Sequence, residues 1–183
     1  MADDTRTRIQ TIALELFTEQ GYDATSLREI AERLGVTKAA LYYHYPSKQA
    51  LLLAIIEPLI AEWKTAADKT ETLQHTTDNV RQVLGECLDV LLRHRAIAGM
   101  FTRDAPAVFE ALGHLYEDIL GVHQRLHTWL AGPNPTGADR VRAFAATEVL
   151  GAALGGATLD DTSDEELRAI LLDASCAVLR LKD

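Results

Sequence analysis

The chain has 183 residues, of which 48% are hydrophobic and 25% are charged, as in an ordinary globular protein of one domain or two small ones. Two cysteines are too few for a disulfide framework, and the polar first residues lack the apolar segment of a signal peptide. No apolar run approaches the ~20 residues that a membrane helix needs. We therefore expect a cytoplasmic protein with no membrane partner.

The charge is distributed unevenly. The formal net charge is −9, which by itself argues mildly against nucleic-acid binding. Residues 1–50 hold six basic and seven acidic side chains, however, and the acidic excess lies in residues 51–183. A nearly neutral N-terminal segment can still present a basic face, so the charge does not exclude a DNA-binding protein.

The first predicted element is a helix ending before Gly21. Its hydrophobic residues recur at helical spacing, and the glycine can terminate it. These residues are Ile9, Ile12, Ala13, Leu16 and Phe17.

Three more helices follow at short intervals. Ser26 and Glu29 have the spacing of a capping box and predict a second helix that ends at Gly35. Thr37 can cap a short third helix to about His44, and Ser47 can cap a fourth. The tight turn at Gly35 between two short helices is typical of a helix-turn-helix. An ordinary helical hairpin in a bundle has the same spacing, so the pattern alone leaves both interpretations open.

The segment from about residue 6 to residue 53 resembles the DNA-binding domain of TetR-family transcriptional regulators. The resemblance rests on an unbroken order of motifs: Phe17, Gly21-Tyr22, TSLREIA at residues 25–31 and LGVTKAALYYHYPSK at residues 34–48. It implies an all-α protein in which residues 1–46 form a three-helix DNA-binding domain with the helix-turn-helix. A long helix then leads into a helical ligand-binding and dimerisation domain over residues 47–183.

The resemblance also implies which residues contact DNA. Positions at the start of the second helix, on the third helix and at the head of the fourth would meet phosphates or base edges. The matching residues here are Thr25, Ser26, Thr37, Lys38, Ala39, Tyr42, Tyr43, His44 and Lys48. Arg6 and Arg8 could reach the adjacent backbone. Only Lys38 has a long polar reach to a base, so the operator sequence is not readable.

The remaining chain is also predicted to be helical. Pro106 suits a helix start, residues 132–137 form the clearest loop, and Ser163 with Glu166 has the spacing of a second capping box. Helices are expected near residues 73–95, 97–103, 105–131, 138–157 and 163–181. No segment alternates with period two, so we expect no sheet.

The family dimerises through its last two helices, and the helix near 138–157 is rich in alanine and glycine. Small side chains permit close approach of a second helix, so we expect an interface there, although packing on the protein's own core would explain the same residues. The interface candidates are Gly151, Ala152, Gly155 and Gly156.

An unidentified small-molecule ligand would bind among the helices between about residues 51 and 131. Aromatic, methionine and polar residues at helical spacing are its candidate contacts, although such residues are more often plain core. They are Trp63, Met100, Phe101, Arg103, Phe109, Tyr116 and His123. The acidic balance weakly favours a cationic or neutral ligand.

Three further features have two interpretations each. His123 and His127 are four residues apart, which is a usable metal-ligand spacing, but isolated imidazoles on one helix face are commoner, so no metal or other cofactor is expected. Pro58 interrupts the fourth helix and should kink it; the kink would either help transmit ligand binding to the DNA-binding domain or be a static bend. Cys87 and Cys176 are expected to be small core residues.

Three functions compete. The leading hypothesis is a ligand-responsive transcriptional regulator, most simply a repressor that binds a palindromic operator as a homodimer and is released by a small-molecule inducer. A module that binds a protein partner would suit the nearly neutral N-terminal segment. An enzyme is not expected, because the sequence shows no nucleophile–base pair, phosphate loop or metal quartet.

Overall fold

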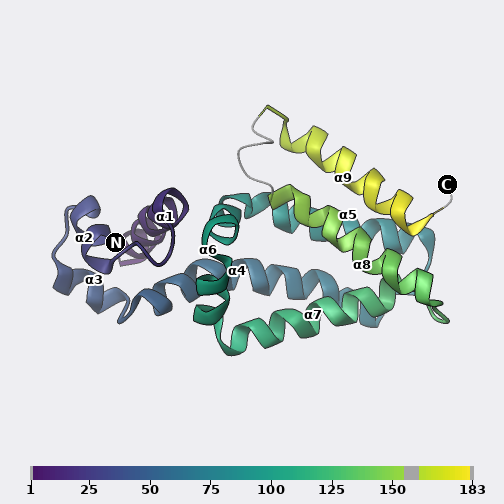
Figure 1. Cartoon of the computed structure of the whole chain (residues 1–183), viewed down its shortest axis with the longest axis horizontal. Helices are drawn as coiled ribbons and strands as arrows, with labels where there is room; N and C mark the ends of the chain where they lie inside the picture. The colour runs from purple at the N-terminus through teal and green to yellow at the C-terminus, as the bar shows by residue number, and fades with distance from the viewer. Residues whose placement is uncertain (1, 155–160, 182–183) are drawn as a thin grey trace. The chain divides into compact units, whose positions relative to one another are not determined.

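The computed structural model describes residues 2–154 and 161–181, except for the side chains of residues 2–4, 98, 99, 101–103, 114 and 154. Within these ranges the chain is helical and has no strand, which confirms the predicted all-α class (Figure 1). The α-helices are α1 (Ala2–Gln20), α2 (Leu27–Leu34), α3 (Lys38–His44), α4 (Lys48–Asp68), α5 (Thr77–Arg93), α6 (Ala98–Leu112), α7 (His114–Leu130), α8 (Gly137–Gly151) and α9 (Asp164–Leu179). Three short 3₁₀ segments are η1 (Lys69–Glu71), η2 (Arg95–Ile97) and η3 (Ala152–Leu154). None of the described helices combines the length and hydrophobicity that crossing a membrane requires.

The chain packs into two compact units. The first unit comprises Met1–Pro58 and Ala96–Tyr116, and the second comprises Leu59–Arg95 and Glu117–Asp183. The division at Pro58 lies inside α4, whereas the domain boundary predicted from the sequence lies between residues 46 and 47. Compactness does not test which residues bind DNA or ligand, so that boundary remains a prediction.

The first unit contains α1, α2, α3, the start of α4 and α6. Phe17, Ile30 and Leu41 are completely buried in it, and burying a side chain of this size stabilises the fold by about 1.5–3 kcal/mol. Phe17 also makes an edge-to-face contact with Tyr22, their ring centroids 5.2 Å apart. These contacts fix the positions of the short helices that follow.

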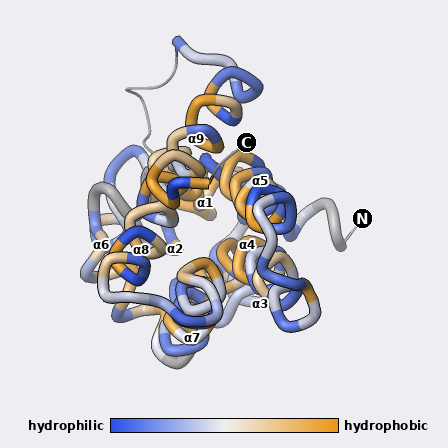
Figure 2. Tube along the Cα trace, turned by 90° about the vertical axis from the view of Figure 1, so that its right-hand side faces the viewer, coloured by the Kyte–Doolittle hydropathy of each residue, from blue (hydrophilic) through white to orange (hydrophobic). Residues whose placement is uncertain are grey.

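The second unit is built mainly on α5, α8 and α9, which pack against one another. Figure 2 shows hydrophobic and hydrophilic residues along the same helices, as expected for amphipathic elements with one buried face. The fully buried face of α5 carries Val80, Val83, Leu84 and Leu88, together with Cys87. Burial raises the pKa of the Cys87 thiol to about 12. Cys176 is buried as well, so the structure confirms both cysteines as core residues.

Several sequence-predicted boundaries need correction. The single helix expected over residues 105–131 is two helices, because Gly113 (φ 53°) ends α6 and α7 begins at His114. The break expected before Pro106 is confirmed by non-helical dihedrals at Asp104 (φ −131°, ψ 38°). Ser163 caps α9 through the Glu166 amide, but the return bond of a capping box is not formed. A full box occurs instead at Thr136 and Asp139, where none was predicted.

Candidate nucleic-acid interface

The helix-turn-helix is held by local hydrogen bonds that the sequence predicts. The Glu29 amide donates to Ser26 Oγ at 3.2 Å, and the Ser26 amide donates to Glu29 Oε2 at 2.9 Å, which confirms the capping box at the start of α2. The hydrogen bonds from Ser26 hold the pKa of the Glu29 carboxyl below its usual value. Gly35 then adopts φ 70°, a left-handed conformation that favours glycine, and ends α2.

After the turn, α3 has one face buried in the first unit and one face exposed to solvent. The Val36 amide donates to the Ala31 carbonyl at 3.0 Å, and Thr37 caps α3 by accepting from the Ala40 amide at 3.2 Å. Leu41 anchors the buried face of α3 and is completely inaccessible. Lys38, Ala39 and Ala40 are all exposed. The N-terminal half of α3 therefore presents one long cation between small side chains.

The aromatic residues of α3 extend this exposed surface. Tyr42 is 42% exposed and Tyr43 is 87% exposed, values that a core role would not produce. The Lys38 ammonium lies 5.3 Å from the centroid of the Tyr42 ring, and the Tyr43 ring meets the His44 ring edge-on at 5.4 Å. Tyr45, by contrast, is buried. The predicted contact residues Thr37, Lys38, Ala39, Tyr42 and Tyr43 therefore share an accessible surface, with His44 half-buried beside them.

Thr25 does not have the free side chain that a phosphate contact needs. It is buried, and its hydroxyl donates to the Gly21 carbonyl at 2.7 Å. Gln20 Nε2 also donates to the Thr25 hydroxyl oxygen at 3.2 Å. The structure thus uses the Thr25 side chain to close the loop between α1 and α2. The neighbouring Ser26 is exposed, and its hydroxyl donates to Glu29 Oε2 at 3.1 Å.

Lys48 has an internal role that was not predicted from the sequence. Its ammonium donates to the carbonyls of Tyr22 at 2.7 Å and Asp23 at 3.2 Å, and it lies 4.3 Å from the centroid of the Tyr22 ring. Burial lowers the Lys48 pKa, against the opposing effect of the Asp23 and Asp104 carboxylates. An ammonium has three donors, so one N–H remains for a phosphate. Lys48 thus ties the head of α4 to the loop before α2.

A second cationic surface lies between α1 and α2. Arg8 and Arg33 line a shallow depression of about 220 Å³ with Thr7, Thr11, Ile12 and Leu34. Arg6 is directed elsewhere, since its guanidinium lies 5.5 Å from the centroid of the Tyr45 ring. The two arginines of the depression are 25 positions apart, and no local pattern in the sequence connects them.

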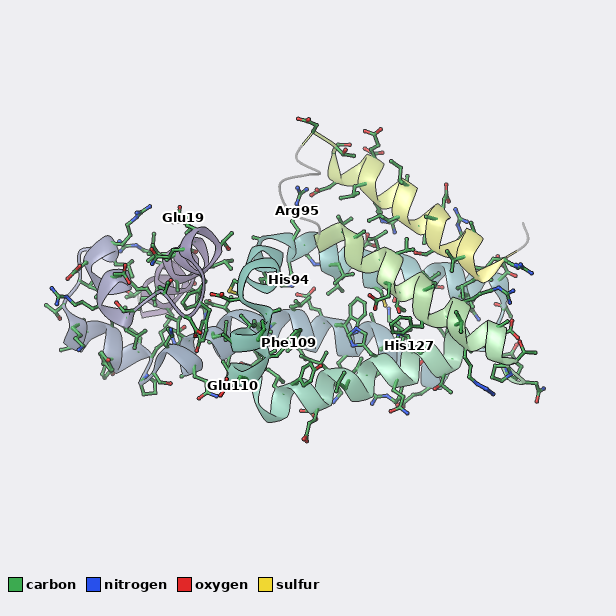
Figure 3. The ribbon with its side chains drawn as sticks, in the orientation of Figure 1. Glu19, His94, Arg95, Phe109, Glu110 and His127 are labelled. Atoms are coloured by element: carbon green, nitrogen blue, oxygen red, sulfur yellow. The ribbon has the colours of Figure 1, made fainter. Side chains whose placement is uncertain are left out.

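The ligand candidates fall into both units. In the first unit Met100 is completely buried. Phe109 of α6 (Figure 3) contacts Tyr116 with ring centroids 5.0 Å apart. In the second unit His123 stacks on Trp63 at 5.3 Å. Phe101 and Arg103 lie outside the side chains that the structure describes. The structure therefore supports two local pairs, and whether they contact a ligand remains a prediction.

The histidines have partners that the sequence did not indicate. His94, which follows α5 (Figure 3), lies with Nε2 3.1 Å from Glu62 Oε1, and Arg93 donates to Glu62 Oε2. The bond from His94, followed by that from Arg93, lowers the pKa of the Glu62 carboxyl. His75 Nε2 lies 3.3 Å from the Leu130 carbonyl. Among the described residues, no group of three or more His, Cys, Asp or Glu is placed to hold a metal.

The dimerisation candidates are accessible only in part. Gly151 and Ala152 are exposed, whereas Gly155 and Gly156 lie outside the described residues. Ala143 and Ala146 are completely buried, so part of the alanine-rich character of α8 serves its own core.

The last two helices also carry an exposed hydrophobic set that was not predicted from the sequence: Val141 (68%), Phe144 (54%) and Ile170 (54%). Val141, Phe144, Glu148 and Gly151 recur at helical spacing and form one stripe along α8. The larger side chains of this stripe are therefore stronger interface candidates than the small ones.

Comparisons with known proteins agree with this geometry. Residues 9–55 match the family of "Bacterial regulatory proteins, tetR family". The chain is 40% identical over 72 residues to the tetracycline repressor protein class A from transposon 1721 of Escherichia coli, a match that covers 39% of this chain and 31% of that protein. It is 36% identical over 77 residues to the transcriptional activator FasR of Mycolicibacterium smegmatis, a match that covers 42% of this chain and 34% of that protein. The match thus spans about a third of the length of these relatives.

The fold resemblance is more extensive than the sequence match. The crystal structure of Mycobacterium smegmatis AmtR aligns with a TM-score of 0.81 at 20% identity, covering 97% of this chain and 87% of that one. At this identity the comparison shows a shared fold. Of the two relatives, one is named as a repressor and the other as a transcriptional activator.

Proposed function

Since this chain belongs to the TetR family of helix-turn-helix transcriptional regulators, we propose that it is a repressor that binds a palindromic operator as a homodimer. A small-molecule inducer would release it, and it would work in the cytoplasm. The observation that carries this proposal is the exposed face of α3, where Lys38, Ala39 and Ala40 are open to solvent while Leu41 is completely buried.

The surface of α3 suits the major groove. A recognition helix must expose small residues where it approaches the base edges and polar residues where it reaches them. Lys38 is the long side chain at the head of α3, so it is our candidate for a base contact. Tyr42, Tyr43 and His44 are candidates for phosphate contacts, because hydroxyls and imidazoles commonly bond phosphate oxygens.

Flanking residues would fix the position of α3 on the duplex. Ser26 at the start of α2 and the third N–H of Lys48 are our candidates for phosphate contacts beside the exposed face. Arg8 and Arg33 extend the cationic surface and are further candidates for backbone contacts. Their charges offset the acidic residues nearby, so a net charge of −9 for the whole chain does not contradict local attraction to phosphate.

The homodimer is supported by the exposed hydrophobic stripe on α8. Val141 and Phe144 of α8 and Ile170 of α9 are each more than half exposed, and exposed hydrophobic side chains that gather in a patch mark interaction surfaces. A homodimer carries two α3 helices, which suits a palindrome whose half-sites lie about one helical turn apart.

Release by a ligand follows from differential binding. A ligand that binds the conformation with the wrong α3 separation shifts the population away from the DNA-binding conformation. The name of the tetracycline repressor relative fits this interpretation, whereas FasR is named as an activator.

The proposal is tested by selecting bound duplexes from a random pool with the full-length protein. A repressor of this kind should enrich a palindrome with half-sites about one turn apart. Placing the enriched site over a promoter then separates repression from activation by the sign of the change in transcript level. Failure to enrich any sequence would contradict the proposal.

A further inference from the structure

Trp63 has a buried donor without a partner. The Trp63 side chain is only 7% exposed. Among the described side chains, its Nε1 is the one buried polar atom for which no hydrogen-bond partner is found. A buried N–H without an acceptor has lost its hydrogen bond to water and gained none in return. The other tryptophan, Trp129, donates from its Nε1 to the Leu73 carbonyl at 3.3 Å. The indole N–H of Trp129 therefore has an acceptor in the fold, whereas that of Trp63 has none.

The neighbouring His123 supplies an acceptor. Its ring stacks on the Trp63 indole with centroids 5.3 Å apart and an interplanar angle of 29°. Its Nδ1 lies 2.9 Å from the Ile119 carbonyl, which can only accept, so Nδ1 carries the hydrogen. In the neutral ring the lone pair of Nε2 is then the remaining polar group. His123 is only partly buried.

His127 limits the charge around this pair. Its Nε2 lies 2.7 Å from the Thr147 hydroxyl oxygen, and that hydroxyl donates to the Phe144 carbonyl at 2.8 Å. His127 Nε2 is therefore the donor in its bond to Thr147. Burial, followed by the proximity of His123, lowers the pKa of His127, so His127 is neutral near pH 7. The indole packs within the apolar core of the second unit, which also includes Val122 and Leu126.

We propose that Trp63 Nε1 and His123 Nε2 recognise a neutral aromatic ligand that carries a carbonyl acceptor beside an N–H or O–H donor, as in an aromatic amide. The carbonyl oxygen accepts from the indole N–H, the ligand's N–H or O–H donates to the imidazole, and the aromatic ring packs on apolar side chains of the core. A cation is disfavoured because the indole N–H presents positive charge to it. This inference rests on the proposed ligand-responsive function and specifies the chemistry of the inducer.

The test uses acetanilide as the probe and the indole N–H resonances of the full-length ¹⁵N-labelled protein. The sequence has two tryptophans, so Trp129→Phe leaves a single indole signal and assigns it to Trp63. Acetanilide should move the Trp63 indole proton downfield, as a new hydrogen bond requires. N-ethylaniline, which lacks the carbonyl, should not, and the Trp129 signal should stay in place with both probes. A Trp63 signal that ignores millimolar acetanilide, or that responds equally to N-ethylaniline, overturns the proposal.

Two variants measure the contribution to binding. Trp63→Phe keeps an aromatic ring but removes the donor, and His123→Phe keeps the stack but removes the acceptor. Each should weaken acetanilide binding by about tenfold, the equivalent of roughly 1.4 kcal/mol, whereas Trp129→Phe should bind like the wild type. Unchanged affinity in both variants would overturn the assignment. None of these measurements includes DNA, so their failure is distinguishable from failure of the regulator proposal.

Discussion

The side-chain amide of Gln10 in α1 donates to the carbonyl of Ala54 in α4 at 3.4 Å. Ala54 lies four residues before Pro58, which has no amide hydrogen, so the Ala54 carbonyl lacks its usual helical donor. Gln10 Nε2 also lies 2.9 Å from the Tyr45 hydroxyl oxygen. Pro58 therefore leaves an acceptor in α4 that a neighbouring helix of the first unit uses.

This relationship predicts a coupling between Gln10 and Pro58. Gln10→Leu should lower the free energy of unfolding of the wild type by about 0.5–1.5 kcal/mol. The same substitution should lower it by less in a Pro58→Ala background, because there the amide of the introduced alanine can donate to the Ala54 carbonyl. Urea unfolding of the four proteins gives the coupling energy, and the lost Tyr45 bond cancels between backgrounds. Additive effects would show that the long Gln10–Ala54 bond contributes nothing. The same Pro58→Ala protein, titrated with operator and inducer, would show whether Pro58 influences DNA release.

A second prediction concerns the hydrophobic stripe on α8. Phe144→Asp should convert the homodimer to a monomer, because a dimer interface would have to bury the new carboxylate without a partner. Sedimentation at micromolar concentration measures the mass directly. Arg28→Ala, a substitution on the exposed surface of α2, is the matched control and should remain dimeric. A wild-type monomer, or an unaffected Phe144→Asp dimer, would contradict the proposed interface.

A third prediction follows from the lowered pKa of His127. The unfolded chain binds a proton at this residue near pH 6.5, whereas the folded chain binds it only at lower pH. The contribution of His127 to the free energy of unfolding is fully present above about pH 6.5. It is lost as the pH falls below that value, because the unfolded state binds the proton first. His127→Gln should therefore flatten the loss of stability between about pH 7 and 5. Parallel pH profiles for the two proteins would rule out this role.

Much of the helix-turn-helix segment could be predicted because its structure depends on local chemistry. The capping box at Ser26, the left-handed Gly35 and the cap at Thr37 each involve residues within four positions of one another. The boundary at Gly113 was missed because the surrounding hydrophobic periodicity continues across it. The internal bond of Thr25 was missed because family resemblance indicates a position and not what its side chain contacts.

The contacts that could not be predicted from the sequence join residues that lie far apart in the chain. Lys48 meets carbonyls 25 and 26 positions away, and the Gln10–Ala54 bond spans 44 positions. Whether Trp63 finds a hydrogen-bond partner depends on the packing of α4 against α7. The exposure of Val141 and Phe144 likewise depends on which face of α8 its own unit covers.

The fourth prediction separates two roles of Lys48. Lys48→Met should destabilise the fold by about 1–2 kcal/mol, since two carbonyls lose a charged donor, and should also reduce the salt dependence of DNA binding by about one phosphate contact per subunit. Lys38→Met, at an exposed position, should leave stability within about 0.5 kcal/mol of the wild type. If Lys48→Met lowers the affinity for DNA but leaves the salt dependence of binding unchanged, Lys48 acts only through its hydrogen bonds to the Tyr22 and Asp23 carbonyls.

The measurement that tests the central claim most directly is a DNA-binding titration at several salt concentrations, on the selected palindrome and on a scrambled duplex. The wild type should bind both, with log K falling linearly with log salt concentration, and should prefer the palindrome. Lys38→Ala should lose about 1–3 kcal/mol on the palindrome while its binding to the scrambled duplex changes much less, because a base contact carries sequence information. A wild-type protein without salt-dependent DNA binding would contradict the account and favour a module that binds a protein partner.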